Sequence, residues 1–423
     1  MLDYDVVIVG GGLVGGSLAC ALRGTGLSVA VVEAVAAGAP SHPSYDERVI
    51  ALSLGSRRIF GGIGIWEQIA PDAEPIRHVH VSDRGHFGFA HLAADEEGVE
   101  ALGYVAPARG IGQALEAGLG PAPDVDLLRP ARLIGLSLKP AHWHLEVAVD
   151  GSSRLLRARL LVAADGGDSA LRRRLGLPVR QRDYGYDAII STVTPQRAQA
   201  QTAFERFTDS GPLAMLPMTG GRFSVVWTAR REETAGILAL DDDAFVHRLQ
   251  QRFGDRLGHL QRPGRRVAYP LRLMLAKELT RPRLVLIGNA AHTLHPVAGQ
   301  GFNLGLRDVA ELADLLVDAE HTGQDPGGSA VLSGYRKRRG GDQAAVAMLT
   351  DTLARLFVNP WTPVRLGRNL GMLGLDLLPP ARHLLAQRFM GTGGRLPRLA
   401  RGIGLSHSPL ATGDCDEGHA RIL

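Results

Sequence analysis

The sequence predicts an α/β protein that has a lobe with a mostly parallel sheet, an inserted lobe with an antiparallel sheet, and a helical C-terminal region. Three observations predict this fold. Apolar runs at residues 4–9, 160–164 and 284–287 each end in a small polar turn, as buried parallel strands do. Residues 181–230 alternate polar and apolar side chains, which is typical of an antiparallel sheet with one face in water. From about residue 330 onward the apolar spacing is helical.

The chain begins with a βαβ unit of the Rossmann type. The strand at residues 4–9 runs into Gly10-x-Gly12-x-x-Gly15, which opens a helix, and residues 28–33 form the next strand. Gly10 permits the tight turn, Gly12 lets the backbone approach a pyrophosphate, and Gly15 lets the helix pack on the strand. The unpaired N–H groups at the start of the helix would bind the pyrophosphate. These features predict a dinucleotide site.

Glu33 ends the second strand of this unit. A carboxylate at that place can accept hydrogen bonds from both hydroxyls of the adenosine ribose. It would repel a ribose 2′-phosphate, so the sequence predicts bound FAD or NAD and not bound NADP.

The dinucleotide lobe is expected to be discontinuous, because the antiparallel segment interrupts it. We assign residues 1–75, 106–180 and 281–330 to this lobe, and residues 76–105 and 181–280 to a substrate lobe. Residues 331–392 form the helical C-terminal region. The segment 393–423 is rich in Gly, Arg, Pro and Ser, so we expect a poorly ordered tail.

Composition limits the class of protein. The net charge is +4 for 423 residues, and the basic run at 336–339 is expected to be a solvated helix face, so nothing favours nucleic-acid binding. Cys20 and Cys415 cannot form a disulfide framework, which suits a reduced cytoplasmic compartment. No stretch approaches the roughly 20 apolar residues of a membrane span. We expect a cytoplasmic protein, with at most peripheral contact to the bacterial inner membrane.

Two further motifs follow the other two parallel strands. Asp165-Gly166-x-x-Ser169-x-x-Arg172 resembles the strand-end signature of flavoprotein aromatic hydroxylases. The segment 288–303 resembles their flavin-ribityl motif; it contains Gly288, Asn289, His292, His295, Pro296, Gly299, Gln300, Gly301 and Asn303. The resemblance implies that the dinucleotide is FAD.

The same resemblance implies roles for these residues. Asp165 and Gly166 would serve the flavin and the pyridine nucleotide, and Asn289 would face the ribityl chain or pyrophosphate. Gly299, Gln300 and Gly301 would begin a helix beside the flavin pyrimidine ring, with Asn303 in its first turn. The partial positive charge of a helix start would stabilise the anionic reduced flavin.

More segments extend the resemblance to one family. They are residues 46–52, 81–86, 204–208 and 211–218, and together with segment 288–303 they resemble the ubiquinone-biosynthesis hydroxylases, closest to the bacterial 2-octaprenyl-6-methoxyphenol hydroxylases. The likeness covers about residues 4–392. In that family the arginine at the position of Arg48 reaches the flavin. The wider superfamily has Asp where this chain has Asn289, a change that removes a charge but keeps an acceptor oxygen.

This resemblance implies an FAD-dependent aromatic-ring monooxygenase of the single-component type. NADPH, NADH or another electron donor would dock transiently, and molecular oxygen would react with reduced flavin to give a C4a-hydroperoxide. The substrate would be a polyprenyl phenol, with 2-polyprenyl-6-methoxyphenol converted to the methoxy-benzoquinol. A quinone-synthesis complex or lipid-handling partner would suit such a substrate. The catalytic base is not identified, and Pro296, His292 and His295 are weak candidates near the flavin.

Other interpretations remain open at this stage. A sister hydroxylase acting at another ring position would share every motif. An NAD-dependent dehydrogenase would be colourless when pure, whereas a non-catalytic flavoprotein subunit of a quinone-synthesis assembly would bind flavin without substrate-dependent NAD(P)H oxidation. His78 and His80 lie on one strand face without a third ligand at metal spacing, so we expect no metal site there.

Overall fold

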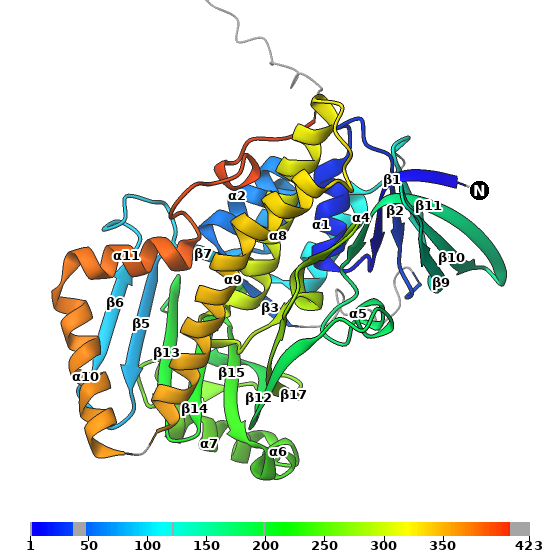
Figure 1. The fold of residues 1–423 in the computed structure, drawn as a ribbon. Coiled ribbons are helices and arrows are strands. Elements are labelled where there is room, and N and C mark those ends of the chain that lie inside the picture. The colour runs from blue at the N-terminus through cyan, green and yellow to red at the C-terminus, as the bar shows by residue number, and fades with distance from the viewer. Residues whose placement is uncertain (1, 37–47, 121, 198, 360, 407–423) are drawn as a thin grey trace, which may run out of the picture.

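The computed structural model describes residues 2–36, 48–120, 122–197, 199–359 and 361–406. Its first sheet is the predicted parallel one (Figure 1). The parallel strands of this sheet are β19 (Leu284–Leu286), β11 (Ser152–Ala163), β1 (Leu2–Val9), β2 (Val29–Val32) and β8 (Val125–Leu128), in that spatial order. An antiparallel strand, β18 (Thr280–Arg281), lies at the β19 edge, and β10 (Trp143–Val149) pairs antiparallel with the first half of β11 and with β9 (Ala131–Leu138).

Helices pack on this sheet because its strands are apolar on both faces. Val6, Val7 and Ile8 of β1 are fully buried, as the uninterrupted apolar run predicted. Helices that share this core include α1 (Leu13–Leu22), α2 (Leu54–Ile63), α3 (Trp66–Ile69), α4 (Ala108–Gly118), α8 (Gln300–His321) and the first turns of α9 (Ser329–Val358). The short helix α5 (Ala170–Arg174) follows β11. A small sheet of β3 (Val49–Ser53), β7 (Gly103–Pro107) and β4 (Glu74–Ile76) lies beside them.

The second sheet is mostly antiparallel, as the alternating segment predicted, and its main strands come from the two segments that the sequence assigned to a second lobe. Its main strands, in spatial order, are β17 (Val267–Ala276), β12 (Val179–Pro195), β15 (Phe223–Arg230), β14 (Gly211–Pro217), β13 (Thr202–Thr208), β5 (His78–Asp83) and β6 (Phe89–Ala93). The pairing is antiparallel except between β13 and β5. Helices α6 (Arg231–Leu238) and α7 (Asp242–Phe253) pack on one face of this sheet around Trp227 and Phe245. The other face is directed towards the first lobe and α9 (Ser329–Val358).

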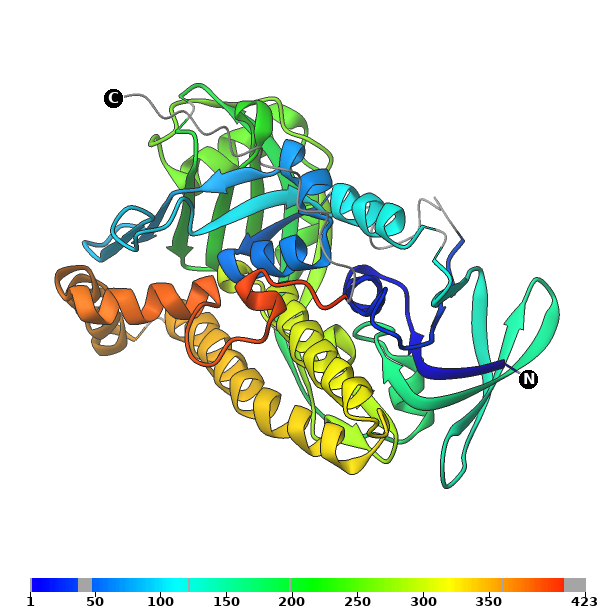
Figure 2. The same ribbon diagram turned by 90° about the horizontal axis from the view of Figure 1, so that it is seen from above.

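The helical C-terminal region begins with α9, which runs from the first lobe to the second sheet (Figure 1). It continues in α10 (Thr362–Leu377) and α11 (Pro379–Met390), which lie beside β5 and β6 at one end of the molecule (Figures 1 and 2). No helix among the described residues is long and apolar enough to cross a membrane.

The expectation of a poorly ordered tail from residue 393 is wrong for residues 393–406. Leu399, Ala400 and Leu405 are buried in the core of the first lobe, and the guanidinium of Arg398 forms an ion pair with Asp314 at 2.7 Å. A few well-placed apolar side chains fix this segment despite its polar composition. Residues 407–423 lie outside the described residues.

The basic run at 336–339 forms the expected solvated face only in part: Arg336 and Lys337 are exposed, whereas Arg339 is not. Arg339 is 4% exposed, and its guanidinium forms ion pairs with Asp308 and Asp342, both at 2.7 Å. Helix α9 packs on α8 through this side of the helix, so one arginine of the run is directed into the protein. A charge run on a helix therefore need not be a surface feature.

Candidate cofactor cradle

The glycines of the N-terminal turn meet different demands. Gly10 has φ +103°, and a Cβ there would lie 2.5 Å from the carbonyl oxygen of Ala164. A Cβ on Gly15 would lie 1.9 Å from the carbonyl oxygen of Gly10, so α1 packs on β1 only with glycine at this position. A Cβ on Gly12 would meet no protein atom within 4 Å. The fold requires glycine at positions 10 and 15, whereas Gly12 leaves open space at the start of α1.

The start of α1 has the properties of an anion site. Gly12 is its N-cap, no side chain caps it, and its first turn has no acidic residue. The helix spans 10 residues, so its N–H groups and dipole favour an anion at this end.

Glu33 lies directly after β2 and is 7% exposed. Its Oε2 accepts a hydrogen bond from the Gly11 N–H at 2.6 Å, and its Oε1 accepts one from the Val35 N–H at 2.8 Å. The carboxylate therefore holds the glycine turn in place.

The second motif lies against the first. A Cβ on Gly10 would lie 2.8 Å from the Cα of Asp165, which follows β11. The Asp165 carboxylate accepts hydrogen bonds from the Ser169 hydroxyl and, at 3.0 Å, from the Leu171 N–H, so it caps α5. Gly166 has φ +82° and open space at its Cβ position.

Arg172 joins the second motif to the third. It is 4% exposed, and its guanidinium donates hydrogen bonds to the Ala290 carbonyl at 2.9 Å and to the Gly167 carbonyl at 2.6 Å. The sequence placed Arg172 in a motif but gave it no role. The spacing of Arg172 from Asp165 was the only feature of the sequence that pointed to this residue, and its contact with Ala290 depends on the fold.

The third motif begins at the end of β19. Gly288 has φ +56°, and a Cβ there would lie 2.9 Å from Val14 of α1. The next residue, Asn289, is exposed and makes no hydrogen bond within the described part of the chain. Because β1, β11 and β19 are neighbours in one parallel sheet, the three motifs meet at its carboxyl edge.

The two candidate histidines of this motif are buried. His292 is 0% exposed, and its Nε2 lies 2.7 Å from the carboxylate of Asp308. Asp308 also accepts hydrogen bonds from the Gly288 N–H at 3.1 Å and from Arg339 at 2.7 Å. Burial alone would raise the pKa of Asp308, but Arg339 and His292 outweigh it and hold this pKa below its usual range. His292 therefore belongs to a buried polar network.

His295 is 3% exposed, and its Nδ1 accepts a hydrogen bond from the Val297 N–H at 3.2 Å. Burial lowers its pKa to about 4, so the ring is neutral at pH 7. Pro296, which follows His295, is exposed and precedes a turn of 3₁₀ helix, Val297–Gly299. Both candidate histidines therefore lie inside the fold, His292 within a polar network and His295 as a neutral ring.

The helix start predicted at Gly299 to Gly301 is confirmed. Helix α8 begins at Gln300, with Gly299 as its N-cap at φ +61°. Ala298 also has a positive φ, +58°, which is strained for a residue with a Cβ. A Cβ on Gly301 would meet no protein atom within 4 Å, so the open side of this turn resembles the one at Gly12.

Asn303 lies in the first turn of α8, where its amide is fully used by the protein. Its Oδ1 accepts hydrogen bonds from the Ser53 N–H and the Ser56 hydroxyl. Its Nδ2 donates to the carbonyls of Ala51 and Gly299. Asn303 therefore ties β3 and α2 to the start of α8. Gln300 is 5% exposed and donates to the Ala298 carbonyl at 3.0 Å.

Arg48 precedes β3, and its guanidinium lies 4.9 Å from the centre of the Tyr269 ring on β17. It therefore bridges the two lobes. Asp46 and Glu47 of the same motif lie outside the described residues.

A cavity of about 100 Å³ lies beside the start of α8. It reaches Ala298 and Gln300 on one side and α11 on the other. Apolar side chains from several elements form its walls: Ile76, Val79, Leu92, Leu102, Ala386, Phe389 and Met390. This cavity joins the helix start to the apolar inner face of the second sheet.

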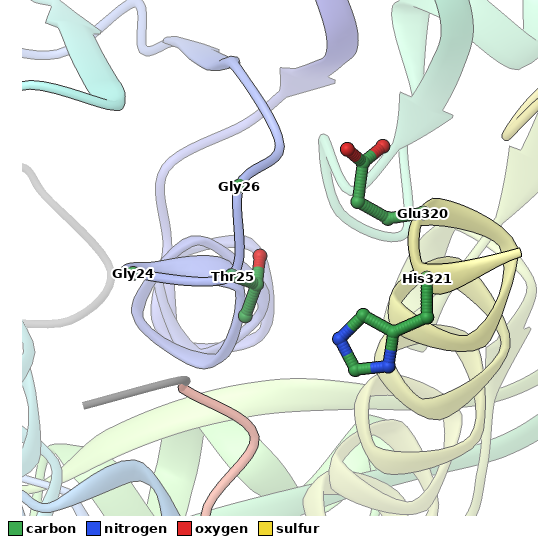
Figure 3. A pocket seen from close by; sticks show the side chains of 5 residues that line it. All are labelled: Gly24, Thr25, Gly26, Glu320 and His321. Atoms are coloured by element: carbon green, nitrogen blue, oxygen red, sulfur yellow. The ribbon is translucent and has the colours of Figure 1, made fainter. Parts of the chain in front are cut away.

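A larger, open cleft of about 530 Å³ lies elsewhere (Figure 3). Its lining residues, labelled there, are Gly24, Thr25, Gly26, Glu320 and His321. Three of these residues follow the C-terminal end of α1, and the other two are the last residues of α8. Because α1 has 10 residues, the cleft is about 15 Å from the glycine turn at the start of that helix. It is not part of the cradle.

Comparison with known families points to one class of enzyme. A family model described as an FAD binding domain matches residues 3–349. The chain is 42% identical to the ubiquinone hydroxylase UbiL of Rhodospirillum rubrum over 405 residues, which cover 95% of this chain and 93% of the relative. It is 32% identical to the 3-demethoxyubiquinol 3-hydroxylase of Escherichia coli (88% and 94% covered), and 30% identical to the mouse mitochondrial ubiquinone biosynthesis monooxygenase COQ6 (90% and 89% covered).

Solved structures share the fold. The p-nitrophenol 4-monooxygenase PnpA of Pseudomonas putida superposes with a TM-score of 0.76 at 19% identity, over 94% of this chain and 100% of that one. PqsL of Pseudomonas aeruginosa, described as a probable FAD-dependent monooxygenase, gives a TM-score of 0.74 at 22% identity, over 88% of this chain and 100% of that one. At these identities the likeness shows the architecture alone.

Proposed function

Because the chain belongs to the ubiquinone-biosynthesis hydroxylase family of FAD-dependent monooxygenases, we propose that it hydroxylates the ring of a polyprenyl phenol. The proposed substrate is 2-polyprenyl-6-methoxyphenol and the product is the methoxy-benzoquinol. The observation that carries this proposal is the meeting of three motifs at one sheet edge, where Gly12 and Gly301 leave open space that the protein does not fill.

The cradle residues fit FAD. We assign the adenosine ribose to Glu33, the pyrophosphate to the start of α1 at Gly12, and the ribityl chain to Asn289. Gly10 and Gly15 shape the first turn, and Asp165, Gly166 and Gly288 form the strand ends beside it. Gly299, Gln300 and Gly301 present the start of α8 to the flavin ring, and Arg48 completes the site where its guanidinium meets Tyr269 of the second sheet. We assign Asn303 to support of this turn, because its amide has no free hydrogen-bonding group.

When bound, FAD would supply the redox chemistry for inserting one oxygen atom of O₂ into the ring, with NADPH, NADH or another transient donor as the proposed reductant. The chain binds and orients the two reactants and excludes water from them. Side chains of the strand Gly211–Pro217 alternate between the two faces of the second sheet, so only every second residue can border the space between this sheet and the first lobe. Leu213 and Met215 are buried in the core under α6 and α7, whereas Leu216 packs on the inner face.

A lipid substrate agrees with the surface of the C-terminal helices. The exposed large apolar side chains there are Trp361, Leu366, Leu370, Leu377, Leu378 and Leu384. Arg388 is exposed beside them, and no carboxylate pairs with it in the described part of the chain. We propose peripheral contact of this cytoplasmic protein with the inner membrane through α10 and α11. A quinone-synthesis complex with a lipid-handling protein is the alternative for the same surface.

Attack at another ring position is a second candidate. One observation favours it: the Escherichia coli relative at 32% identity is named for hydroxylation at position 3 of demethoxyubiquinol. Differences of about an ångström in how a pocket holds the ring decide such regiochemistry, and the motifs do not encode them.

Two experiments test the proposed function. The purified protein should be yellow and release FAD on denaturation; a colourless protein contradicts the cofactor assignment. Deletion of the gene in its host, followed by mass spectrometry of the quinone lipids, tests the step. Accumulation of 2-polyprenyl-6-methoxyphenol supports the proposal. Accumulation of 2-polyprenylphenol or of the demethoxy-quinone moves the enzyme to a sister step, and unchanged ubiquinone without any intermediate rejects the pathway.

A further inference from the structure

Glu205 is an acidic side chain on the inner face of the second sheet. Successive residues of a strand point to opposite faces. Phe204 of β13 is buried in the core beneath α6 and α7, so Glu205 points to the other face, towards the first lobe. On that face Ala203 belongs to an apolar cluster with Ile76 and Val105, and Phe207 belongs to another with Met372. Glu205 therefore lies between two apolar clusters.

The carboxyl of Glu205 has no protein partner. No hydrogen bond or ion pair joins it to any described residue, and its side chain keeps part of its surface exposed. Such an acid in apolar surroundings costs free energy unless something else satisfies it. Burial is the cause that raises its pKa to about 7.

The charged groups nearest along the sheet are already engaged or lie on the other face. Val81 of β5 and Ala214 of β14 pair directly with Glu205, and neither is ionisable. Asp83, further along the same face, forms an ion pair with Arg368 at 2.9 Å. Arg206 and His80 are directed to the opposite face, where His80 contacts Phe204. From α9, Leu353 and Leu356 pack on this face.

The position of Glu205 relates it to the cofactor cradle. Val79, which pairs with Ala203, lines the cavity that reaches Ala298 and Gln300. Glu205 is two residues beyond Ala203 on an extended strand, which is about 7 Å. An aromatic ring placed between the start of α8 and the sheet could therefore reach the Glu205 carboxyl with its hydroxyl.

We propose that Glu205 is the base that removes the phenol proton of the substrate. The phenol O–H bond breaks, the electron pair stays on the phenolate oxygen, and the proton binds a carboxylate oxygen of Glu205. The phenolate then pushes electron density to the ortho and para carbons, which makes the ring reactive towards electrophilic oxygen. This assignment rests on the proposed phenol hydroxylation.

The chemistry of the group suits this step. A phenol has a pKa of about 10 and an ordinary glutamate one of about 4.3. A carboxylate whose pKa burial raises to about 7 is a stronger base than an ordinary one, yet it is still partly ionised at neutral pH. The group is active when ionised, so the rate should rise with pH through about 7.

The test compares Glu205→Gln, Glu205→Asp and the control Glu67→Gln, an exposed glutamate on α3. Each is purified with FAD bound and assayed with a short-chain 2-prenyl-6-methoxyphenol. General-base removal typically costs 10²–10⁴-fold, so we expect Glu205→Gln to lower kcat roughly 100-fold at pH 7 and to lose the rise through pH 7. Glu205→Asp should retain part of the rate and of the pH profile. Glu67→Gln should match the wild type.

A binding measurement separates the base from a merely structural residue. 4-Nitrophenol is the probe, because its anion absorbs visible light, and its difference spectrum with the flavin-loaded protein reports ionisation. Wild-type protein should hold the phenol anion at lower pH than the Gln variant does. A Glu205→Gln protein with wild-type kcat and pH profile overturns the proposal. A wild-type protein that hydroxylates no phenol at all overturns the proposed function instead.

Discussion

At the scale of the single residue, Gly12 separates what the fold requires from what a ligand requires. We expect Gly12→Val to fold but to be purified mostly without flavin, because the branched side chain would fill the space assigned to the pyrophosphate. The measurement is the ratio of FAD to protein, with circular dichroism as the check on folding. Gly340→Val is a matched control, since a Cβ at Gly340 also meets no atom within 4 Å but lies on α9. A yellow, fully loaded Gly12→Val protein would remove the dinucleotide assignment of this turn.

Asn289 tests the third motif in the same way. Asn289→Asp keeps an acceptor oxygen, so FAD should remain bound. Asn289→Leu leaves ribityl hydroxyls unpaired, which costs about 1–3 kcal/mol, or roughly 5- to 150-fold in the dissociation constant of FAD. Titration of the apoprotein with FAD measures both variants. Equal affinity of the Leu variant and the wild type would show that this side chain does not face the cofactor.

At the scale of the element, α10 differs from an ordinary surface helix. Its outward residues Leu366, Leu370 and Leu377 are each more than half exposed, and Gly367, Gly371 and Gly374 lie between them. Charged residues instead contact the body: Arg368 pairs with Asp83, and Asp376 accepts a hydrogen bond from the His91 N–H. The helix therefore presents an apolar stripe outward, as an interfacial helix does.

We expect Leu366→Glu combined with Leu370→Glu to weaken binding to vesicles of anionic phospholipid, because two charges would enter the apolar layer. Co-sedimentation measures this, and Leu138→Glu, at an exposed leucine of β9 at the other end of the molecule, is the control. Unchanged sedimentation of the double variant would favour a protein partner for the stripe. Point changes are better than truncation after residue 354, because α11 lines the cavity and residues 393–406 pack on the first lobe.

At the scale of the whole molecule, Asp308 connects the cradle to the helical region. It binds the Gly288 N–H and His292 on one side and Arg339 and Gln343 of α9 on the other. We expect Asp308→Ala to lower the free energy of unfolding by about 3–5 kcal/mol, because Arg339 would lose its fully buried partner. Thermal unfolding measures it, and Asp318→Ala, whose ion pair with Arg398 is at the surface, is the control. Equal losses in the two variants would contradict a special role for the network.

The sequence alone determined the parts of this protein that depend on local backbone demands. The turns at Gly10 and Gly299, the helix that begins at Gln300 and the strands before each motif all follow from glycine geometry and apolar runs. They could be predicted because the constraint and its residue are neighbours in the chain. The family resemblance likewise rests on motifs that each lie within one short segment.

Only the tertiary structure decided which polar side chains are buried and what they meet. His292, His295 and Asn303 looked like cofactor or proton ligands, yet the fold uses them in internal hydrogen bonds. Arg339 looked exposed and is buried, and residues 393–406 looked mobile and are packed. Glu205 lies in a segment that carries the family resemblance but received no role from the sequence, because a strand does not reveal which of its two faces will border the site. Burial depends on residues far away in the chain, and burial is what changes the chemistry of an acid or a histidine.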